Sequence, residues 1–233
     1  MIENWKDVQI VPEFCDQGVD CYRLEGGHFL NEYYIVSEAE TRKLMNHPEV
    51  VGCEVYASLV TATSQMMYYL KEKKKITSAN ILSILRGALN YPLEESCYKE
   101  HIRVHDISFM SSERVFENGE MTGLEIKYCK LATVPNSTLL IGDIIASGES
   151  MLDIGYELKM RGARNIFTCC TFPLFTAGLE KFDKAYNDGI IKAVLGTNLT
   201  YRKPELLERE WYYDVDVLSL IHISEPTRHA QIS

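Results

Sequence analysis

Two short segments of the sequence carry residue types that could bind an anionic ligand, and the first lies at residues 138–151. It reads TLLIGDIIASGESM, an apolar run followed by Ser147, Gly148 and Ser150 and then by a helical pattern. Where a strand turns into a helix, unpaired backbone N–H groups and the helix dipole attract a phosphate, and serine hydroxyls add donors. Gly148 lets the backbone approach the ligand closely. The segment predicts a phosphate-binding loop; the alternative is an ordinary strand-to-helix turn capped by a serine.

The second segment, residues 84–89, reads ILRGAL and also follows an apolar strand pattern. Its Arg86 is suited to a diphosphate, because a guanidinium group donates two parallel hydrogen bonds to an oxyanion. The alternative is an arginine at a strand end that forms an ordinary surface ion pair.

These segments resemble the phosphoribosyl-pyrophosphate motif and the pyrophosphate loop of type I phosphoribosyltransferases, and they are closest in motif to the uracil type. The resemblance covers residues 54–199. It implies that Asp143 hydrogen-bonds the ribose and that Arg86 contacts the pyrophosphate, and these two are the expected catalytic residues. The other substrate-binding residues that it implies are Leu85 and Gly87 in the pyrophosphate loop, and Ala146, Ser147, Gly148, Glu149 and Ser150 around the 5′-phosphate.

The resemblance adds two further regions to the expected site. A polar stretch separates the strands predicted at residues 102–110 and 124–131, and it stands where the uracil enzymes carry a mobile flap. The loop after the last core strand is where family members bind the base. The residues implied are Ser111, Arg114 and Lys130 for the diphosphate, each with a solvated surface position as the alternative, and Thr197 and Asn198 for the base.

The activity implied is transfer of a phosphoribosyl group to a nucleobase nitrogen with release of pyrophosphate. Mg²⁺ is the implied cofactor, bound mainly through the diphosphate of the ligand. The expected partners are phosphoribosyl pyrophosphate, a nucleobase and a second copy of the chain in a homodimer. Two alternatives remain: a non-catalytic regulatory protein of the same fold that binds a phosphoribosyl ligand or nucleotide, and a ribose-phosphate pyrophosphokinase-like paralogue, to which residues 197–217 are similar.

Three positions bear on the activity and on the choice of base. Gly142 stands where the family has its first acid, and Glu149 puts a carboxylate beside the expected phosphate. Ala146 stands where purine-salvage members often have a carboxylate base, and an alanine cannot move a proton. A pyrimidine-like base is therefore favoured over a 6-oxopurine.

The elements that must position these loops alternate between strand and helix patterns. Apolar runs such as residues 138–145 alternate with amphipathic segments such as 54–74 and 148–163. Apolar strands bounded by helices indicate a twisted, mostly parallel sheet covered on both faces. We expect an α/β, phosphoribosyltransferase-type core over residues 51–217, with a small β-containing cap over residues 1–50.

Charge and composition exclude several other classes. The 233 residues include 33 acidic and 24 basic residues, and the net charge of −9 argues against binding to nucleic acid or an anionic membrane. Without a long apolar run or a secretory pattern at the start, a cytoplasmic location is expected. The seven cysteines lack metal-binding spacing and are expected to be free thiols, mostly buried. Residues 218–233 resemble translated adapter sequence from a sequencing library, and we expect them to be foreign.

Overall fold

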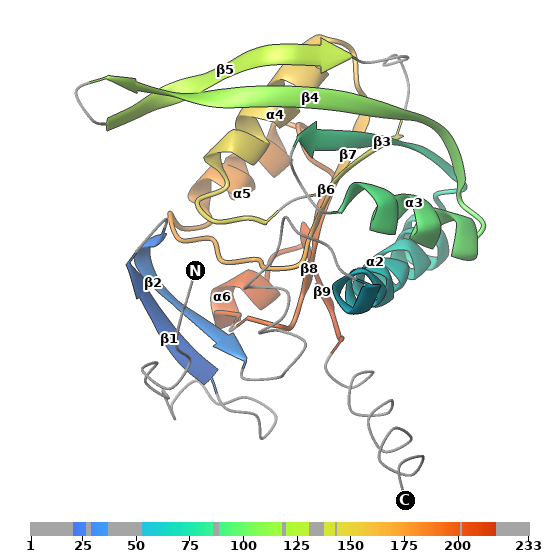
Figure 1. Cartoon of the computed structure of the whole chain (residues 1–233), viewed down its shortest axis with the longest axis horizontal. Coiled ribbons are helices and arrows are strands. Elements are labelled where there is room, and N and C mark those ends of the chain that lie inside the picture. Colours follow the sequence, from blue (N-terminus) through green and yellow to red (C-terminus); the bar gives the residue numbers. More distant parts are fainter. Residues whose placement is uncertain are drawn as a thin grey trace, which may run out of the picture.

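The computed structural model describes residues 21–26, 29–36, 53–85, 89–117, 120–130, 138–142, 144–200 and 202–217. Its main element is a seven-stranded sheet with the strand order β5-β4-β3-β6-β7-β8-β9 (Figure 1). All neighbouring strands run parallel except β5, which is antiparallel to β4. The strands are β3 (Ser78–Leu85), β4 (Arg103–Glu117), β5 (Glu120–Lys130), β6 (Thr138–Gly142), β7 (Asn165–Cys170), β8 (Ala193–Thr197) and β9 (Tyr212–Val215).

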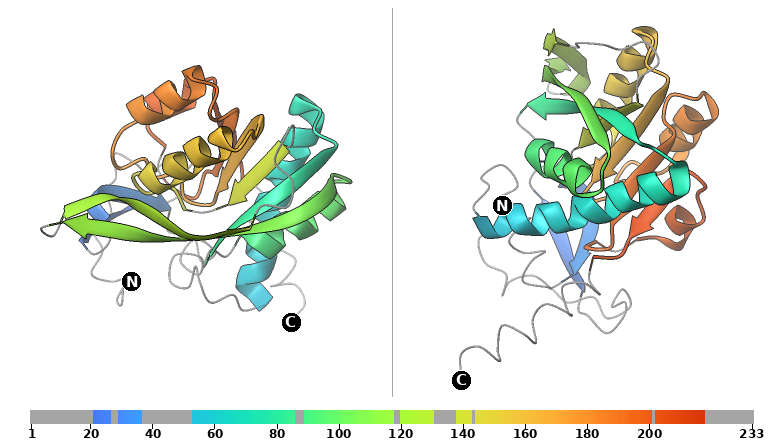
Figure 2. Two further views of the ribbon diagram at one scale, coloured as in Figure 1. Left: turned by 90° about the horizontal axis from the view of Figure 1, so that it is seen from above. Right: turned by 90° about the vertical axis from the view of Figure 1, so that its right-hand side faces the viewer.

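Helices cover both faces of this sheet, as the alternating sequence pattern predicts. Helices α2 and α3 lie on one face, and α4 and α5 lie on the other (Figures 1 and 2). The predicted α/β fold with a mostly parallel sheet is confirmed. The helices are α2 (Cys53–Lys74), α3 (Asn90–Lys99), α4 (Glu149–Met160), α5 (Glu180–Asn187) and the short α6 (Pro204–Leu207).

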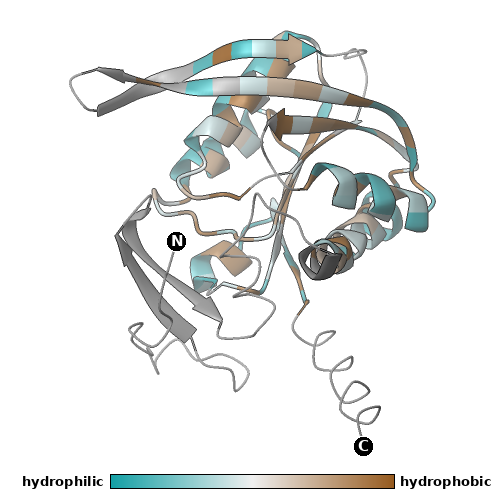
Figure 3. Ribbon diagram, in the orientation of Figure 1, coloured by the Kyte–Doolittle hydropathy of each residue, from teal (hydrophilic) through white to brown (hydrophobic). Residues whose placement is uncertain are grey.

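Successive residues of the central strands feed two separate cores, because side chains alternate between the faces of a strand. In β6, Leu140 packs into the core beneath α2 and α3, whereas Ile141 packs against α4. The apolar strands between two helical layers are visible in Figure 3, where β3 is brown and the exposed helix α3 is largely teal. Burial on both faces explains why these strands read as continuous apolar runs.

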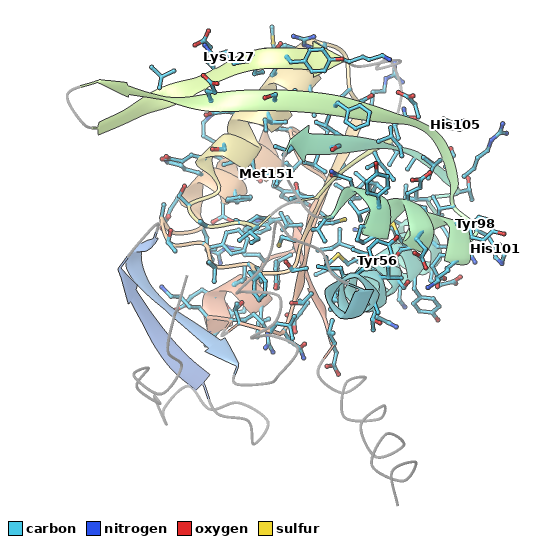
Figure 4. All side chains as sticks on the ribbon, in the orientation of Figure 1. Tyr56, Tyr98, His101, His105, Lys127 and Met151 are labelled. Atoms are coloured by element: carbon cyan, nitrogen blue, oxygen red, sulfur yellow. The ribbon has the colours of Figure 1, made fainter. Side chains whose placement is uncertain are left out.

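Helices α2 and α3 are joined by polar contacts as well as by apolar packing. The Thr63 and Ser96 hydroxyls lie 2.6 Å apart and are both buried. The Tyr56 hydroxyl donates to Glu95 Oε2 at 2.7 Å, and burial together with this contact raises the pKa of Tyr56 to about 12. Figure 4 shows Tyr56 on this side of the sheet and Met151, in α4, on the other.

Strands β4 and β5 are longer than the sequence pattern predicts. Most of the polar stretch expected between two strands belongs to the strands themselves, because their pairing continues from Phe109 and Lys130 out to Glu117 and Glu120. The last β4 residue with a partner in β3 is Ser111. The two strands therefore continue as an antiparallel arm beyond the rest of the sheet (Figure 1).

The carboxyl-terminal part of the core adds an element that the sequence pattern does not predict. Strand β9 pairs in parallel with β8, so Val194 faces Tyr212 and Thr197 faces Val215. Trp211, immediately before β9, is buried against α5. Residues 204–215 are thereby part of the main core.

Several other expectations concern the ends of the chain or its cysteines. An antiparallel hairpin of β1 (Cys21–Gly26) and β2 (Phe29–Val36) confirms the predicted amino-terminal β structure. From the capping-box pattern of Ser37 and Glu40, a short helix is also expected over residues 39–47, and both it and the segment 218–233 lie outside the described residues. The four cysteines in the described core are free thiols, as predicted, and only Cys129 among them is not fully buried.

Candidate phosphate-binding site

The two predicted loops follow neighbouring strands at the carboxyl edge of the sheet. Strands β3 and β6 pair with each other, with Ser83 opposite Gly142. From β3 the chain continues to β4 on one side, and from β6 it continues to β7 on the other. Open α/β sheets bind ligands at such a switch point, where the connections diverge. The switch point of this sheet is thus flanked by the segments that the sequence singles out.

Three of the predicted residues follow these strands but lie outside the described residues. They are Arg86 and Gly87 after β3, and Asp143 after β6. Leu85 is the last residue of β3 and pairs with Ser111 of β4. The predicted roles of Arg86 and Asp143 in contacting pyrophosphate and ribose stay predictions.

The phosphate loop turns into α4 at Gly148, whose backbone φ is +82°. Residues other than glycine are strained in this left-handed conformation. A Cβ atom at this position would also lie 2.5 Å from Phe182 Cζ and closer still to its Cε2. Glycine is therefore required for two reasons: the backbone has a positive φ, and the buried Phe182 ring of α5 leaves no space for a side chain.

The loop presents unpaired donors at the amino end of α4. The Glu149 N–H donates weakly to Ser147 Oγ at 3.4 Å. The N–H groups of Gly148, Ser150 and Met151 find no acceptor among the described residues. With the positive end of the helix dipole, such amides form an anion site. Ser147 and Ser150 are both half-buried.

The backbone before the loop is held in place by the segment that follows β7. Ile145 N–H donates to the Phe172 carbonyl at 3.2 Å, and the Ile145 carbonyl accepts from Leu174 N–H at 2.9 Å. The Ala146 carbonyl accepts from Thr176 N–H at 3.0 Å. These three bonds fix the backbone of residues 145 and 146 against the segment after β7.

Glu149, the residue that places an acid beside the predicted phosphate, has a basic partner. Its carboxylate forms an ion pair with the Lys181 ammonium group on α5. Both side chains are partly exposed, with relative accessibilities of 41% for Glu149 and 57% for Lys181. One turn further along α4, burial and the nearby Glu149 raise the pKa of Asp153, and Lys181 partly opposes that rise.

Gly142, which stands in place of the family's first acid, is enclosed by the connection from β3 and by α3. A Cβ atom there would lie 2.7 Å from Leu89 Cβ and 2.7 Å from Leu93 Cδ1. Real Cβ atoms do not approach other carbon atoms so closely, so any larger side chain requires a shift. The glycine is therefore explained by packing.

The predicted flap residues occupy different parts of the β4–β5 arm. Arg114 pairs with Leu124 and lies three residues past Ser111, or about 10 Å at the usual rise of a strand. Lys130 is exposed and pairs with Phe109, which in turn pairs with Ser83 inside the sheet. Only Arg114 therefore extends beyond the sheet edge, and contact of either residue with a diphosphate stays a prediction.

The predicted base-binding residues are buried and have internal hydrogen bonds. Thr197 Oγ1 donates to the Thr171 carbonyl at 2.5 Å. Asn198 donates from Nδ2 to Asp216 at 2.7 Å and accepts on Oδ1 from Val217 N–H at 2.9 Å. These contacts connect the end of β8 to β7 and to the segment after β9. Their recognition of a base stays a prediction, and the contacts give both side chains a structural role.

Two features of the site have no signal in the local sequence pattern. Lys181 is far from Glu149 in the sequence, and the lysine belongs to an otherwise ordinary amphipathic helix. Phe182 is held against the loop by Trp211, whose ring stacks on it with centroids 5.5 Å apart. The Trp211 Nε1–H donates to Asp183 at 2.7 Å, and this carboxylate also accepts from Arg209 at 2.9 Å. Only the tertiary fold brings these residues together.

No protein-family model matches the chain, and no curated protein matches it. Solved structures that resemble it include a hypoxanthine-guanine phosphoribosyltransferase from Leishmania donovani, which is 16% identical with a TM-score of 0.42. That match covers 50% of this chain and 66% of the other, just under two thirds of its length. A hypoxanthine phosphoribosyltransferase from Staphylococcus aureus is 15% identical with a TM-score of 0.43, and covers 70% of this chain and 74% of its own.

A third similar structure is a hypoxanthine phosphoribosyltransferase from Trypanosoma cruzi, 10% identical with a TM-score of 0.43, covering 70% of this chain and 74% of that one. All three enzymes are named for purine bases, whereas the motifs of this chain resemble the uracil type. In the described part of the chain, no helix has the length and apolar character to cross a membrane.

Proposed function

We propose that the protein is a phosphoribosyltransferase that moves the phosphoribosyl group of phosphoribosyl pyrophosphate to a nucleobase and releases pyrophosphate. The observation that carries the proposal is the loop at Gly148, which offers unpaired amides at the switch point of the sheet. This loop follows β6, and the arginine-containing segment 86–88 follows the neighbouring β3. Two segments that carry anion-binding residue types and follow neighbouring strands would suit a ligand with a phosphate at one end and a diphosphate at the other.

In the proposed reaction, a base nitrogen attacks C1 of the ribose while the C1–O bond to pyrophosphate breaks. The leaving pyrophosphate carries away the electron pair of the C1–O bond, and the attacking nitrogen gives up its proton to water or to the released pyrophosphate, so the chain contributes mainly position and charge. The amides around Gly148, with the Ser147 and Ser150 hydroxyls, hold the 5′-phosphate. Arg86 neutralises the diphosphate, and Asp143 orients the ribose.

A magnesium ion is expected to accompany the diphosphate. No group of three or more His, Cys, Asp or Glu side chains that could hold a metal lies among the described residues. As the resemblance implies, the ion would be bound mainly through the diphosphate of the ligand and would supply positive charge to the leaving group.

We infer a pyrimidine-like base from Ala146, which offers no carboxylate for proton exchange with a purine ring. We further propose that residues 51–217 form the catalytic core, that residues 1–50 form a cap and that the working assembly is a homodimer.

The second candidate, a regulatory protein that binds the same ligand without catalysis, is favoured by one observation. Gly142 leaves no space for the family's first acid, which removes one ribose contact.

Binding and turnover separate these two candidates. The full chain is titrated calorimetrically with phosphoribosyl pyrophosphate and Mg²⁺, and pyrophosphate release is then followed with uracil, other pyrimidines and hypoxanthine. Binding with release supports the transferase, and binding without release from any base supports the regulatory protein. The variant Ser150→Ala is expected to weaken binding several-fold. Its control is Ser78→Ala, a half-buried serine at the opposite end of β3. Absence of binding by the unmodified chain would reject both.

A further inference from the structure

The charge at the phosphate loop depends on a residue outside the recognised motifs. Glu149 is the first residue of α4, where the helix dipole is equivalent to about half a positive charge. A carboxylate at this position would make the loop negative and would repel a phosphate. The ion pair with Lys181 removes this negative charge, because the ammonium group neutralises the carboxylate. The helix amides then remain as the net positive feature of the loop.

Lys181 is held beside the loop by its neighbours in the chain. The next residue, Phe182, is fully buried and its ring contacts Gly148. The residue after that, Asp183, accepts hydrogen bonds from Arg209 and Trp211. Two consecutive anchored residues fix the backbone of α5 at this point. The core packing therefore places the backbone of Lys181 where its ammonium group reaches Glu149.

We propose that Lys181 is a positioning residue that sets the affinity of the phosphate loop for its anion by neutralising Glu149. The inference rests on the proposed function, because it concerns the site assigned to the 5′-phosphate. Lys181 acts through Glu149 and need not touch the ligand. The carboxylate in a phosphate loop is tolerated because a second helix supplies the matching charge.

The effect expected from Coulomb's law is moderate. At a separation of about 7 Å, repulsion between an uncompensated Glu149 carboxylate and a dianionic phosphate would weaken binding roughly five- to tenfold in a water-like dielectric. The ion pair is largely exposed, so its loss should leave the stability of the fold nearly unchanged. Salt should diminish the effect, because the Debye length falls from about 10 Å at 0.1 M to about 3 Å at 1 M.

The test is a double-mutant cycle with phosphoribosyl pyrophosphate and Mg²⁺ as the probe, measured by calorimetry at low and high salt. The variants are Lys181→Gln, Glu149→Gln and the double variant. The matched control is Lys184→Gln, which removes the same charge from the same helix but belongs to an ion pair with Asp188. Thermal unfolding of each variant checks that the fold is retained.

Lys181→Gln is expected to weaken binding five- to tenfold at low salt. The double variant, in which Glu149→Gln is added to Lys181→Gln, should bind as the unmodified chain does. Lys184→Gln should leave binding unchanged. A double variant that binds as weakly as Lys181→Gln alone would overturn the inference, because Lys181 would then act on the ligand independently of Glu149. Unchanged binding by Lys181→Gln would overturn it as well, while the proposed function would stand. If the unmodified chain does not bind the probe, the proposed function fails, and the inference falls with it.

Discussion

Replacement of Gly148 by alanine is expected to destabilise the protein and to remove ligand binding. The φ of +82° costs a residue with a Cβ about 1–2 kcal/mol. The new Cβ would also lie 2.5 Å from Phe182 Cζ, and relieving such a contact in a packed core costs about 1–3 kcal/mol. The free energy of unfolding should therefore fall by about 2–5 kcal/mol, a large part of the usual total of about 5–15 kcal/mol.

A second glycine of the chain provides the control for this prediction. Gly162, after α4, has a φ of +95°, and a Cβ there would have no atom within 4 Å. Gly162→Ala should thus show the backbone cost alone, and the reduced entropy of the unfolded chain is common to both variants. In urea, the free energy of unfolding of Gly148→Ala should be lower than that of Gly162→Ala by about 1–3 kcal/mol.

The contact with Phe182 is tested by adding Phe182→Leu to each glycine variant. The smaller side chain should recover part of the loss in Gly148→Ala and none in Gly162→Ala, which gives a coupling energy of about 1–3 kcal/mol at the first site only. Equal destabilisation by the two glycine variants, or a coupling energy near zero at Gly148, would refute the argument that the ring of α5 supports the loop.

Three further predictions concern the surroundings of the loop. Gly142→Ala should lower the free energy of unfolding by about 1–3 kcal/mol in urea, because its Cβ would lie 2.7 Å from Leu89 Cβ; wild-type stability would contradict this packing. Trp211→Phe removes the donor to Asp183 but keeps the ring, and should cost about 1–3 kcal/mol in the same assay. Since burial raises the pKa of Asp153, the folded state holds that proton more tightly than the unfolded chain, and stability falls as the pH rises through the two pKa values. In thermal unfolding measured from pH 3 upward, Asp153→Asn should lack this fall in stability. Parallel curves of stability against pH for the unmodified protein and Asp153→Asn would show that the pKa of Asp153 is not raised.

The alternation of strands and helices and the strand-to-helix turn at Gly148 could be predicted from the sequence because they depend on local patterns. The apolar run before Gly148 and the helical spacing after it identify a strand-to-helix turn without tertiary information. Parallel pairing then follows, since strands alternating with helices return to the same edge of the sheet. The positive φ at Gly148 is likewise the conformation for which glycine is selected.

The remaining features depend on contacts between residues far apart in the sequence. The Lys181 partner of Glu149 belongs to another helix, and no spacing rule connects them. Thr197 and Asn198 resemble ligand-binding residues by type, yet their polar atoms serve the β7–β8–β9 connection. The β4–β5 arm contains polar residues that suggest a loop, but both strands pair throughout it, so the backbone hydrogen bonds decide the structure.

The contact of Phe182 with Trp211 has a consequence for how the protein matures during its synthesis. Translation produces the proposed phosphate loop about 60 residues before Trp211, whose indole ring packs on Phe182, and before β9, so both supports come almost last in the described core. Because the ribosomal exit tunnel retains the newest residues, a nascent chain can have its loop outside the ribosome while its support is still inside. Ligand binding should therefore appear abruptly, only after the segment through Val215 has emerged, and it should not grow in proportion to the length of chain already released.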